Sequence, residues 1–584
     1  MNTSIGQGSF QFTPQKAGLP PSSVSDMNSA VEALRQSKKA WADLSVLQRI
    51  VIIDELMSDI RSTADRWASS ATEAKGITVD GIVASEEWLA GPYFTMVILR
   101  QFRRSLLEIE RFGHPRVRGP IMTRPDGRVV AQVFPKRIYD RIFYKGFTGE
   151  VWMQPGVSAD GLSSTQAVKY HGDKGPGKIA LVLGAGNVSS IGPLDIVNKL
   201  FLENQVVLYK TNPVNDYLGP IFTQSFRALI DRGFLRIVYG GSQEGAYLCN
   251  HSEIDEIHIT GSDKTFDSIL FGTGTEGIER KARKEPLLKK RVTGELGNVS
   301  PLIVIPGVWN EDELSYHAEH IATTLANNAG FNCNATRVII QHAEWDQRRV
   351  LLDHARRVLA NVPARNAYYP GAVQRFDAFL TAHPEAERIG TPEEGQLPWV
   401  LASSLDPFKE NDVWFKTEAF CGIMGETALS AKSIPEYIDS AVSFANNTLW
   451  GTLNATILVH PLSLRDPAVA DAVERAITNL RYGAIGINIW AAVSFGLGVT
   501  TWGAYPGSPP DNIQSGVGCV HNTLMFDRVE KSVIRAPFVV RPTPSWFVTR
   551  GKIGVELHKK LVEFEAAPSP FKVPGLLRTA MKKP

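Results

Sequence analysis

Apolar and polar positions alternate with a helical period over the first hundred residues. From Ser29 to Gly76 apolar side chains recur every three or four positions, which predicts amphipathic helix. A second helical stretch runs from Ser85 to Gly113. The pattern changes at residues 128–153, which are rich in Val, Ile, Phe and Tyr and contain turn residues. This segment is predicted to form strands in a hairpin-like excursion.

Short apolar runs alternate with helical segments over most of the remaining chain. Strands are predicted at 178–183, 205–210, 236–240 and 253–260, and in a second series at 301–305, 337–340, 454–459 and 484–489. Helices are predicted at 194–203, 221–232 and around 311–329. Such alternation is typical of βαβ units around a parallel sheet. We therefore expect an α/β fold with two doubly wound domains and a β-strand excursion.

Composition and charge exclude several classes of protein. The 584 residues are 43% hydrophobic and 21% charged, as in an ordinary globular protein. A net charge of +2 argues against a nucleic-acid binder that works through bulk charge. The four cysteines lie far apart and form no CxxC pair, which fits neither a disulfide framework nor a zinc site. The histidines match no metal spacing, so we predict no metal site.

Two uncharged segments are weighed as membrane spans. Residues 88–99 are too short and contain Pro92. Residues 482–510 are long enough, but their glycines and prolines favour a buried strand followed by irregular backbone. The N-terminus lacks an apolar run long enough for a signal peptide. Together with the isolated thiols, this predicts a cytoplasmic protein without an integral span.

Four segments carry candidate chemistry, and each has an ordinary structural explanation when taken alone. GAGNVSS at 184–190 could hold an anion on backbone N–H groups or be a tight βα turn. Glu295 in GELG could be a general base or a loop carboxylate. Cys333 could be a nucleophile or a buried structural cysteine. The basic run at 279–291 could bind an anion or form a solvated face.

Taken together and in order, these motifs resemble the NAD(P)-dependent aldehyde dehydrogenase superfamily over roughly residues 25–530. The motifs that carry the resemblance are Asn187 in LGAGN, Lys210, Gly261 and Ser262 in TGS, Glu295 in GELG, Cys333, and Glu418 with Phe420 in ExF. Six motifs in the superfamily's order make a chance match improbable. Asn298-Val299 and Cys421-Gly422 depart from the usual residues, which marks a divergent branch.

The resemblance implies a role for each matched residue. Cys333 would be the nucleophile, Asn187 an oxyanion donor and Glu295 the general base that activates water. The cofactor, NAD or NADP, would be held by Lys210, Gly240, Gly261, Ser262, Glu418 and Phe420. Pro213 stands where NAD-preferring members usually carry a glutamate, so the choice between the two cofactors stays open.

The implied reaction is oxidation of an aldehyde to a carboxylic acid. The substrate is expected to be apolar, either aromatic or of medium to long chain, because the positions that line the superfamily's tunnel carry Trp88, Tyr93, Phe94, Phe331 and Trp490. One alternative is acyl transfer to coenzyme A or the reverse reduction, which the basic run favours. The other is a cofactor-binding protein without turnover, which the departures from the motifs permit.

The resemblance also divides the chain. Residues 1–127 and 164–293 would form the cofactor-binding domain, 128–163 the bridging strands, 294–523 the catalytic domain and 524–584 a C-terminal arm and tail. Strand edges in such an excursion are usually covered by a partner, which predicts a homodimer or homotetramer. The tail is basic through Lys559, Lys560, Lys572, Arg578, Lys582 and Lys583, so we expect it to wrap an oligomer or, as an alternative, to touch a membrane surface.

Overall fold

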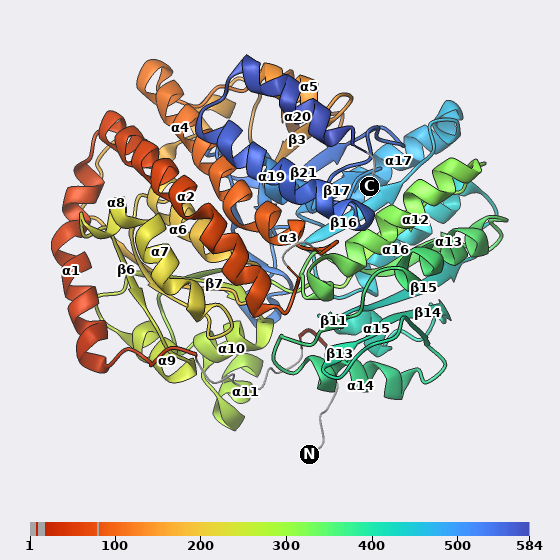
Figure 1. The fold of residues 1–584 in the computed structure, drawn as a ribbon, viewed down its shortest axis with the longest axis horizontal. Helices are drawn as coiled ribbons and strands as arrows, with labels where there is room; N and C mark the ends of the chain where they lie inside the picture. Colours follow the sequence, from red (N-terminus) through yellow and green to blue (C-terminus); the bar gives the residue numbers. More distant parts are fainter. Residues whose placement is uncertain (1–6, 10–17, 79–80, 583–584) are drawn as a thin grey trace.

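Two β-sheets organise the computed structural model, which describes residues 7–9, 18–78 and 81–582 (Figure 1). One sheet has six strands in the order β19-β8-β7-β4-β5-β6. The other has eleven strands in the order β1-β2-β3-β21-β17-β16-β9-β10-β15-β14-β12. The predicted α/β class is therefore confirmed.

The six-stranded sheet is parallel except at its β19 edge. Its strands are β4 (Ile179–Leu183), β5 (Val206–Lys210), β6 (Leu235–Val238), β7 (Glu256–Gly261), β8 (Arg291–Leu296) and β19 (Gly516–Val517). β5 is buried along its whole length, and such continuous apolar runs arise because helices cover both faces of a parallel sheet. The helices between these strands are α6 (Ile191–Phe201), α7 (Gly219–Ser225), α8 (Arg227–Ile230), α9 (Ser242–Asn250), α10 (Asp263–Phe271) and α11 (Gly274–Ala282).

The eleven-stranded sheet has a parallel centre and antiparallel ends. Its parallel strands are β9 (Ser300–Val304), β10 (Thr336–His342), β14 (Trp399–Leu405), β15 (Ile423–Leu429), β16 (Asn454–Leu458), β17 (Ala484–Ile487) and β21 (Val529–Arg535). β12 (Glu387–Ile389) closes one end. Helices α12 (Glu311–Ala326), α13 (Arg348–Ala360), α14 (Ala372–Ala382), α16 (Ile434–Asn447) and α17 (Pro467–Asn479) accompany it.

The strand excursion contains a helix that the sequence pattern did not predict. β1 (Ile121–Thr123), β2 (Val129–Phe134) and β3 (Thr148–Met153) are strands, but α5 (Ile138–Phe143) lies between β2 and β3. The carboxylate of Asp140 accepts from the backbone N–H of Arg137 at 2.8 Å, which caps the first turn of α5. β3 pairs with β2 on one side and with β21 on the other, so its edges are satisfied within one chain.

Most of the N-terminal helices lie against the C-terminal segment in the upper part of Figure 1, whereas the first of them runs along the left edge of the molecule. The N-terminal helices are α1 (Val24–Asp43), α2 (Val46–Ala74), α3 (Ser85–Trp88) and α4 (Phe94–Phe112), with the π-helical turn η1 (Leu89–Tyr93) before α4. The single helical pattern predicted from residue 29 to 76 is broken because Ser45 caps α2 in a reciprocal bond with Gln48. α19 (Gly551–Ala566) packs on α2, α3, η1 and α4, and α20 (Val573–Ala580) packs on α19.

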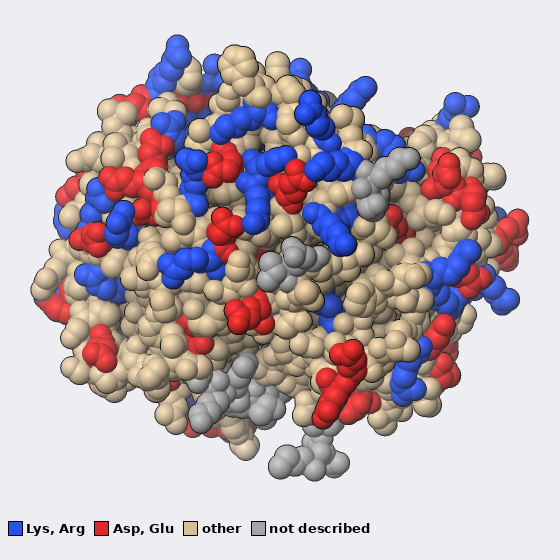
Figure 2. Space-filling model, in the orientation of Figure 1, with Lys and Arg blue, Asp and Glu red and all other residues tan. Residues whose placement is uncertain are grey.

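Several basic residues of the C-terminal segment have partners within the chain. Lys559 pairs with Asp65 at 3.0 Å, and Lys560 and Lys582 both pair with Glu556. Lys572 donates to the carbonyl oxygens of Glu563 and Ala567. In the upper part of Figure 2 basic side chains outnumber acidic ones. Both expectations for the tail, an oligomer-wrapping arm and a membrane-surface contact, therefore stay predictions; Lys583 lies outside the described residues.

The segment weighed as a membrane span is folded into the protein. Residues 482–510 contribute β17, the short helix α18 (Val493–Leu497) and β18 (Trp502–Gly503). Within the described residues, no helix has the length and apolar character needed to cross a bilayer. Most of the expected N-terminal arm, residues 1–6 and 10–17, lies outside the described part of the chain, but Gly8 forms a bridge with Thr417.

Candidate active site

Cys333 lies in a tight loop between α12 and β10. The three residues Asn328, Ala329 and Gly330 have consecutive positive φ angles of 51°, 57° and 77°. At Gly330 an added Cβ would stand 2.4 Å from the carbonyl oxygen of Cys421, so this position requires glycine. Buried Arg337 holds the loop from below by donating to the carbonyl oxygens of Cys421 at 2.6 Å and Gly330 at 2.5 Å.

Glu295 and Cys333 are in direct contact. Glu295 stands near the end of β8, and the Cys333 thiol donates a hydrogen bond to it. Burial raises the pKa of Glu295 to about 8, although the hydrogen bond from Cys333 opposes the shift. Burial and the adjacent Glu295 also raise the pKa of the Cys333 thiol. The Glu295 carboxyl and the Cys333 thiol are therefore both mainly uncharged at neutral pH. As the pH rises, Glu295 ionises, and its carboxylate can accept the proton of the Cys333 thiol.

Asn187 follows β4 and reaches the cysteine loop. Its side-chain Nδ2 donates to the carbonyl oxygen of Phe331 at 2.9 Å, and this leaves its second N–H for another acceptor. The sequence placed Asn187, Glu295 and Cys333 together by resemblance, and the structure brings all three to one point.

A buried network behind Asn187 was missed by sequence reasoning. Lys75 Nζ donates to Glu87 at 2.6 Å, to the Asn187 carbonyl at 2.9 Å and to Asn328 Oδ1 at 2.9 Å. Tyr368 OH donates to the same Asn328 oxygen at 2.8 Å. Lys75 stands at the end of an amphipathic helix, where a lysine is normally solvated, so nothing in the local pattern distinguished it.

A cavity of about 570 Å³ opens on one side of Cys333. It lies at the carboxyl ends of β4, β5 and β7, where ligands bind in open α/β sheets. Of the residues predicted to hold a cofactor, Lys210, Gly261, Ser262, Glu418 and Phe420 line it. Gly240 does not; its carbonyl instead accepts from Lys210 Nζ. Ser9, which no motif singled out, also lines the cavity.

Two ionisable residues of this cavity are strongly affected by burial. Desolvation lowers the pKa of Lys210 to about 8 and raises that of Glu418 to about 7. The backbone N–H of Asn298 donates to Glu418 at 3.1 Å. Asn298 is fully buried and its amide also donates to the carbonyl of Asn454 at 3.0 Å, so this departure from the superfamily pattern ties Glu418 to the second sheet.

A smaller apolar cavity of about 100 Å³ opens on the other side of Cys333. Asn187, Glu295 and Cys333 line both this cavity and the larger one. Tyr93, Phe94 and Trp490 line it as predicted, and Phe495 and Trp546 join them. Trp88 and Phe331 do not line it. Trp88 lies under the Lys559 ammonium, and Phe331 packs on Tyr368 and Tyr369.

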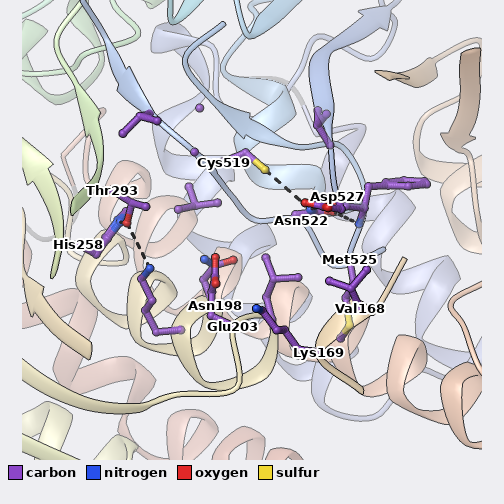
Figure 3. A pocket seen from close by; sticks show the side chains of 18 of the residues that line it. Val168, Lys169, Asn198, Glu203, His258, Thr293, Cys519, Asn522, Met525 and Asp527 are labelled. Atoms are coloured by element: carbon purple, nitrogen blue, oxygen red, sulfur yellow. Dashed lines mark hydrogen bonds between the residues drawn. The ribbon is translucent and has the colours of Figure 1, made fainter. Parts of the chain in front are cut away.

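A larger cavity, of about 820 Å³, lies elsewhere and has many polar side chains in its wall (Figure 3). His258 and Thr293 line it and are hydrogen-bonded at 2.9 Å, and Lys199 donates to Thr293 at 3.2 Å. Figure 3 places Asn198, Glu203 and Asp527 around the same space. Of the predicted site residues only Glu295 borders it, so size alone does not locate the cysteine site.

The basic run at 279–291 forms ion pairs with neighbouring acids. Arg280 pairs with Glu276, Lys281 with Asp267 and Lys284 with Asp511. Arg283 pairs with Glu279 and Glu285, and Arg291 with Glu203 and Glu256. This segment is therefore better described as a solvated surface whose basic side chains form ion pairs with neighbouring acidic ones. In the described residues, no group of three or more His, Cys, Asp or Glu side chains is arranged to hold a metal ion.

Comparison with known proteins agrees with this geometry. Residues 194–374, which include Lys210, Glu295 and Cys333, match the model of the aldehyde dehydrogenase family. The fold matches a crystal structure of an NAD-dependent aldehyde dehydrogenase from Sinorhizobium meliloti with a TM-score of 0.59 and 17% identity, over 93% of this chain and 94% of that one. The resemblance to the aldehyde dehydrogenases is confirmed.

Further matches are either distant in sequence or limited to part of the chain. An NADP-dependent glyceraldehyde-3-phosphate dehydrogenase from Bacillus halodurans, solved with NADP, matches the fold with a TM-score of 0.56 and 15% identity, over 90% of this chain and 96% of that one. An N-succinylglutamate 5-semialdehyde dehydrogenase from Novosphingobium aromaticivorans is 26% identical over 34% of this chain and 38% of its own length. An aminoacetaldehyde dehydrogenase from Pseudomonas aeruginosa is 28% identical over 38% of this chain and 44% of its own length. The chain thus matches less than half the length of these curated relatives.

Proposed function

We propose that this protein oxidises an apolar aldehyde to a carboxylic acid, with NAD⁺ or NADP⁺ as the electron acceptor. The observation that carries the proposal is the position of Cys333, which lies with Glu295 and Asn187 where a large cavity at the carboxyl edge of the sheet meets a small apolar one. A thiol between two such cavities can meet a cofactor from one side and an aldehyde from the other.

Three side chains divide the chemistry. The Cys333 thiol loses its proton to Glu295 and attacks the aldehyde carbon, while the second Asn187 N–H stabilises the oxyanion. After oxidation the acyl group is held as a thioester on Cys333. Glu295 first releases to solvent the proton that it took from Cys333. Its carboxylate then takes a proton from water, the water oxygen adds to the acyl carbon, and the C–S bond breaks to release the acid while Glu295 returns its proton to the Cys333 sulfur.

The residues of the cavity of about 570 Å³ beside Cys333 fit a dinucleotide cofactor. Ser242 and Ser262 stand at the N-termini of α9 and α10, where backbone N–H groups lack helical partners and suit a pyrophosphate. Lys210 and Glu418 are the charged groups that would orient the riboses, and Phe420 would lie beside the nicotinamide ring. When bound, the nicotinamide supplies the hydride acceptor. The choice between NAD and NADP stays open, because the residues that line the cavity next to Lys210 are Asn212, Pro213 and Val214, and none of them is acidic.

The structure favours hydrolysis over transfer to coenzyme A. Glu295 is in place as a base for water, and the basic run that pointed toward an anionic acceptor is occupied by its own ion pairs. The names of the curated relatives indicate amino- and succinylated semialdehydes, but the aromatic side chains of the small cavity favour an apolar substrate here.

The test is the rate of NADH or NADPH formation with butanal, benzaldehyde and aminoacetaldehyde, with and without coenzyme A. We expect a rate that is independent of coenzyme A, highest with an apolar aldehyde, and at least about a thousandfold lower in Cys333→Ala. Cys519→Ala, at a free cysteine away from the two cavities, is the matched control and should keep the rate. A rate that needs coenzyme A would replace hydrolysis by acyl transfer. Cofactor binding with no rate for any aldehyde would favour a non-catalytic protein.

Two further properties are proposed. All four cysteines are free thiols, which suits the reducing cytoplasm. The open edge of the eleven-stranded sheet at β1 suits a second copy of the chain, as in a homodimer or homotetramer.

A further inference from the structure

A second apolar cavity, of about 560 Å³, lies beyond the small one beside Cys333. Its wall comes from four parts of the chain: α4 with η1, the α5 insertion, the end of α18, and the C-terminal segment from Pro537 to Ala580. Most lining side chains are apolar, among them Val97, Phe143, Val539, Leu557, Leu561 and Leu576. The two elements that the reaction does not use, α5 and the C-terminal helices, therefore build one chamber.

The two apolar cavities adjoin. Tyr93, Tyr144, Gly496, Leu497 and Trp546 line both of them, so these residues form the boundary. Tyr93 and Tyr144 are hydrogen-bonded to each other, and the Tyr93 ring stacks on His558 of α19. The inner cavity, at about 100 Å³, holds roughly three groups of the size of a water molecule. An aldehyde with a longer chain must therefore extend into the outer cavity.

Helix α19, which we call the roof of the outer cavity, is firmly attached to the N-terminal helices. Gly551 and Gly554 let α19 approach residues 82–85 so closely that an added Cβ would stand 1.2 Å from the Ile82 carbonyl oxygen and 2.6 Å from Ser85 Cβ. Arg100 donates to the Glu565 and Ala566 carbonyls at 2.8 and 2.7 Å, at the end of α19.

The roof is also tied to the α5 insertion. Arg137, the residue that precedes α5, pairs with buried Glu565 at 3.0 Å. These bonds join the C-terminal helices to α3, α4 and α5. The chamber is thus a built part of the fold, not a loose gap beneath a tail.

We propose that the outer cavity holds the alkyl chain of a long-chain aldehyde whose carbonyl reaches Cys333, and that the C-terminal helices set the accepted chain length. This inference rests on the proposed aldehyde oxidation and deepens it by naming the substrate class. The occupant is a linear alkyl chain because the path between the cavities runs between aromatic side chains and the outer wall is mainly apolar.

The experiment compares kcat/KM for butanal, octanal and dodecanal. Each buried methylene raises binding by about fourfold, so wild-type kcat/KM should rise at least about tenfold from butanal to dodecanal. Leu561→Trp fills the outer cavity from α19; it should lower kcat/KM for dodecanal at least about tenfold and leave butanal within about twofold. Lys552→Trp, at an exposed position of the same helix, is the matched control and should leave both unchanged. If Leu561→Trp does not fold, Ala580→Trp fills the same cavity from α20.

The outcomes separate this inference from the proposed function. Equal kcat/KM for butanal and dodecanal in the wild type, or equal loss of both in Leu561→Trp, would overturn the chamber and leave aldehyde oxidation intact. No cysteine-dependent oxidation of any of the three would overturn both.

Discussion

Glu295 and Cys333 form a buried acid pair, and we expect the protonation of Glu295 to affect both the proposed activity and the stability. Glu295 acts as a base only when ionised, and burial raises its pKa to about 8. The rate of aldehyde oxidation should therefore rise by about tenfold per pH unit below 8 and level off above it. A rate that is flat from pH 6 to 8 would show that another group is the base.

The same shift makes Glu295 a destabilising residue at high pH. Its folded pKa of about 8 lies above the usual glutamate value of 4.5, so the folded state holds the proton more tightly than the unfolded chain. Stability is therefore lost as pH rises from about 4.5 to 8, and Glu295→Gln, which stays neutral, avoids that loss. We expect the variant to gain on the order of a few kcal/mol over wild type at pH 8 and almost nothing at pH 5, measured by urea unfolding. Glu410→Gln, at an exposed position, should show no such trend. If Glu295→Gln raised the free energy of unfolding equally at both pH values, the explanation would be contradicted.

At the scale of the element, the cysteine loop depends on a backbone shape that few residues tolerate. Gly330 has a φ of 77°, and a Cβ added at this position would clash with the Cys421 carbonyl oxygen. Gly390 has a similar φ of 94° but nothing within 4 Å of an added Cβ. Gly390→Ala should cost about 1 kcal/mol from φ alone, and Gly330→Ala at least about 3 kcal/mol with loss of activity. Equal unfolding midpoints for the two variants in urea would show that the loop can move to accommodate the methyl group.

At the scale of the whole molecule, the eleven-stranded sheet has an edge strand at each end, and one end exposes apolar side chains. β1 forms that end, and its Ile121 and Met122 side chains are 41% and 50% exposed. We expect sedimentation velocity to show a dimer or larger assembly, because an exposed apolar strand edge pairs readily with a second copy. Met122→Lys should shift the protein toward the monomer, whereas Ile278→Lys, at a 73% exposed position on α11, should not. A wild-type monomer at micromolar concentration would refute this assembly.

The sequence by itself determined the α/β class and the positions of β4 to β7, β9, β10, β16 and β17, and it predicted the set Asn187, Glu295 and Cys333. Strand and helix periods and turn residues act over a few neighbouring positions, so they are visible without a fold. The motif order added the roles of these residues through resemblance. Even there, α5 was missed, because a six-residue helix between two strands leaves too short a period to detect.

Only the tertiary structure decided what surrounds that set. β21 lies between β3 and β17, Lys75 reaches Asn187 across 112 residues of sequence, and α19 and α20 close a chamber over α4 and α5. Each of these depends on contacts between residues far apart in the chain, where burial and packing outweigh local preference. The physical reason is that a long-range contact leaves no periodic trace in either of the segments that it joins.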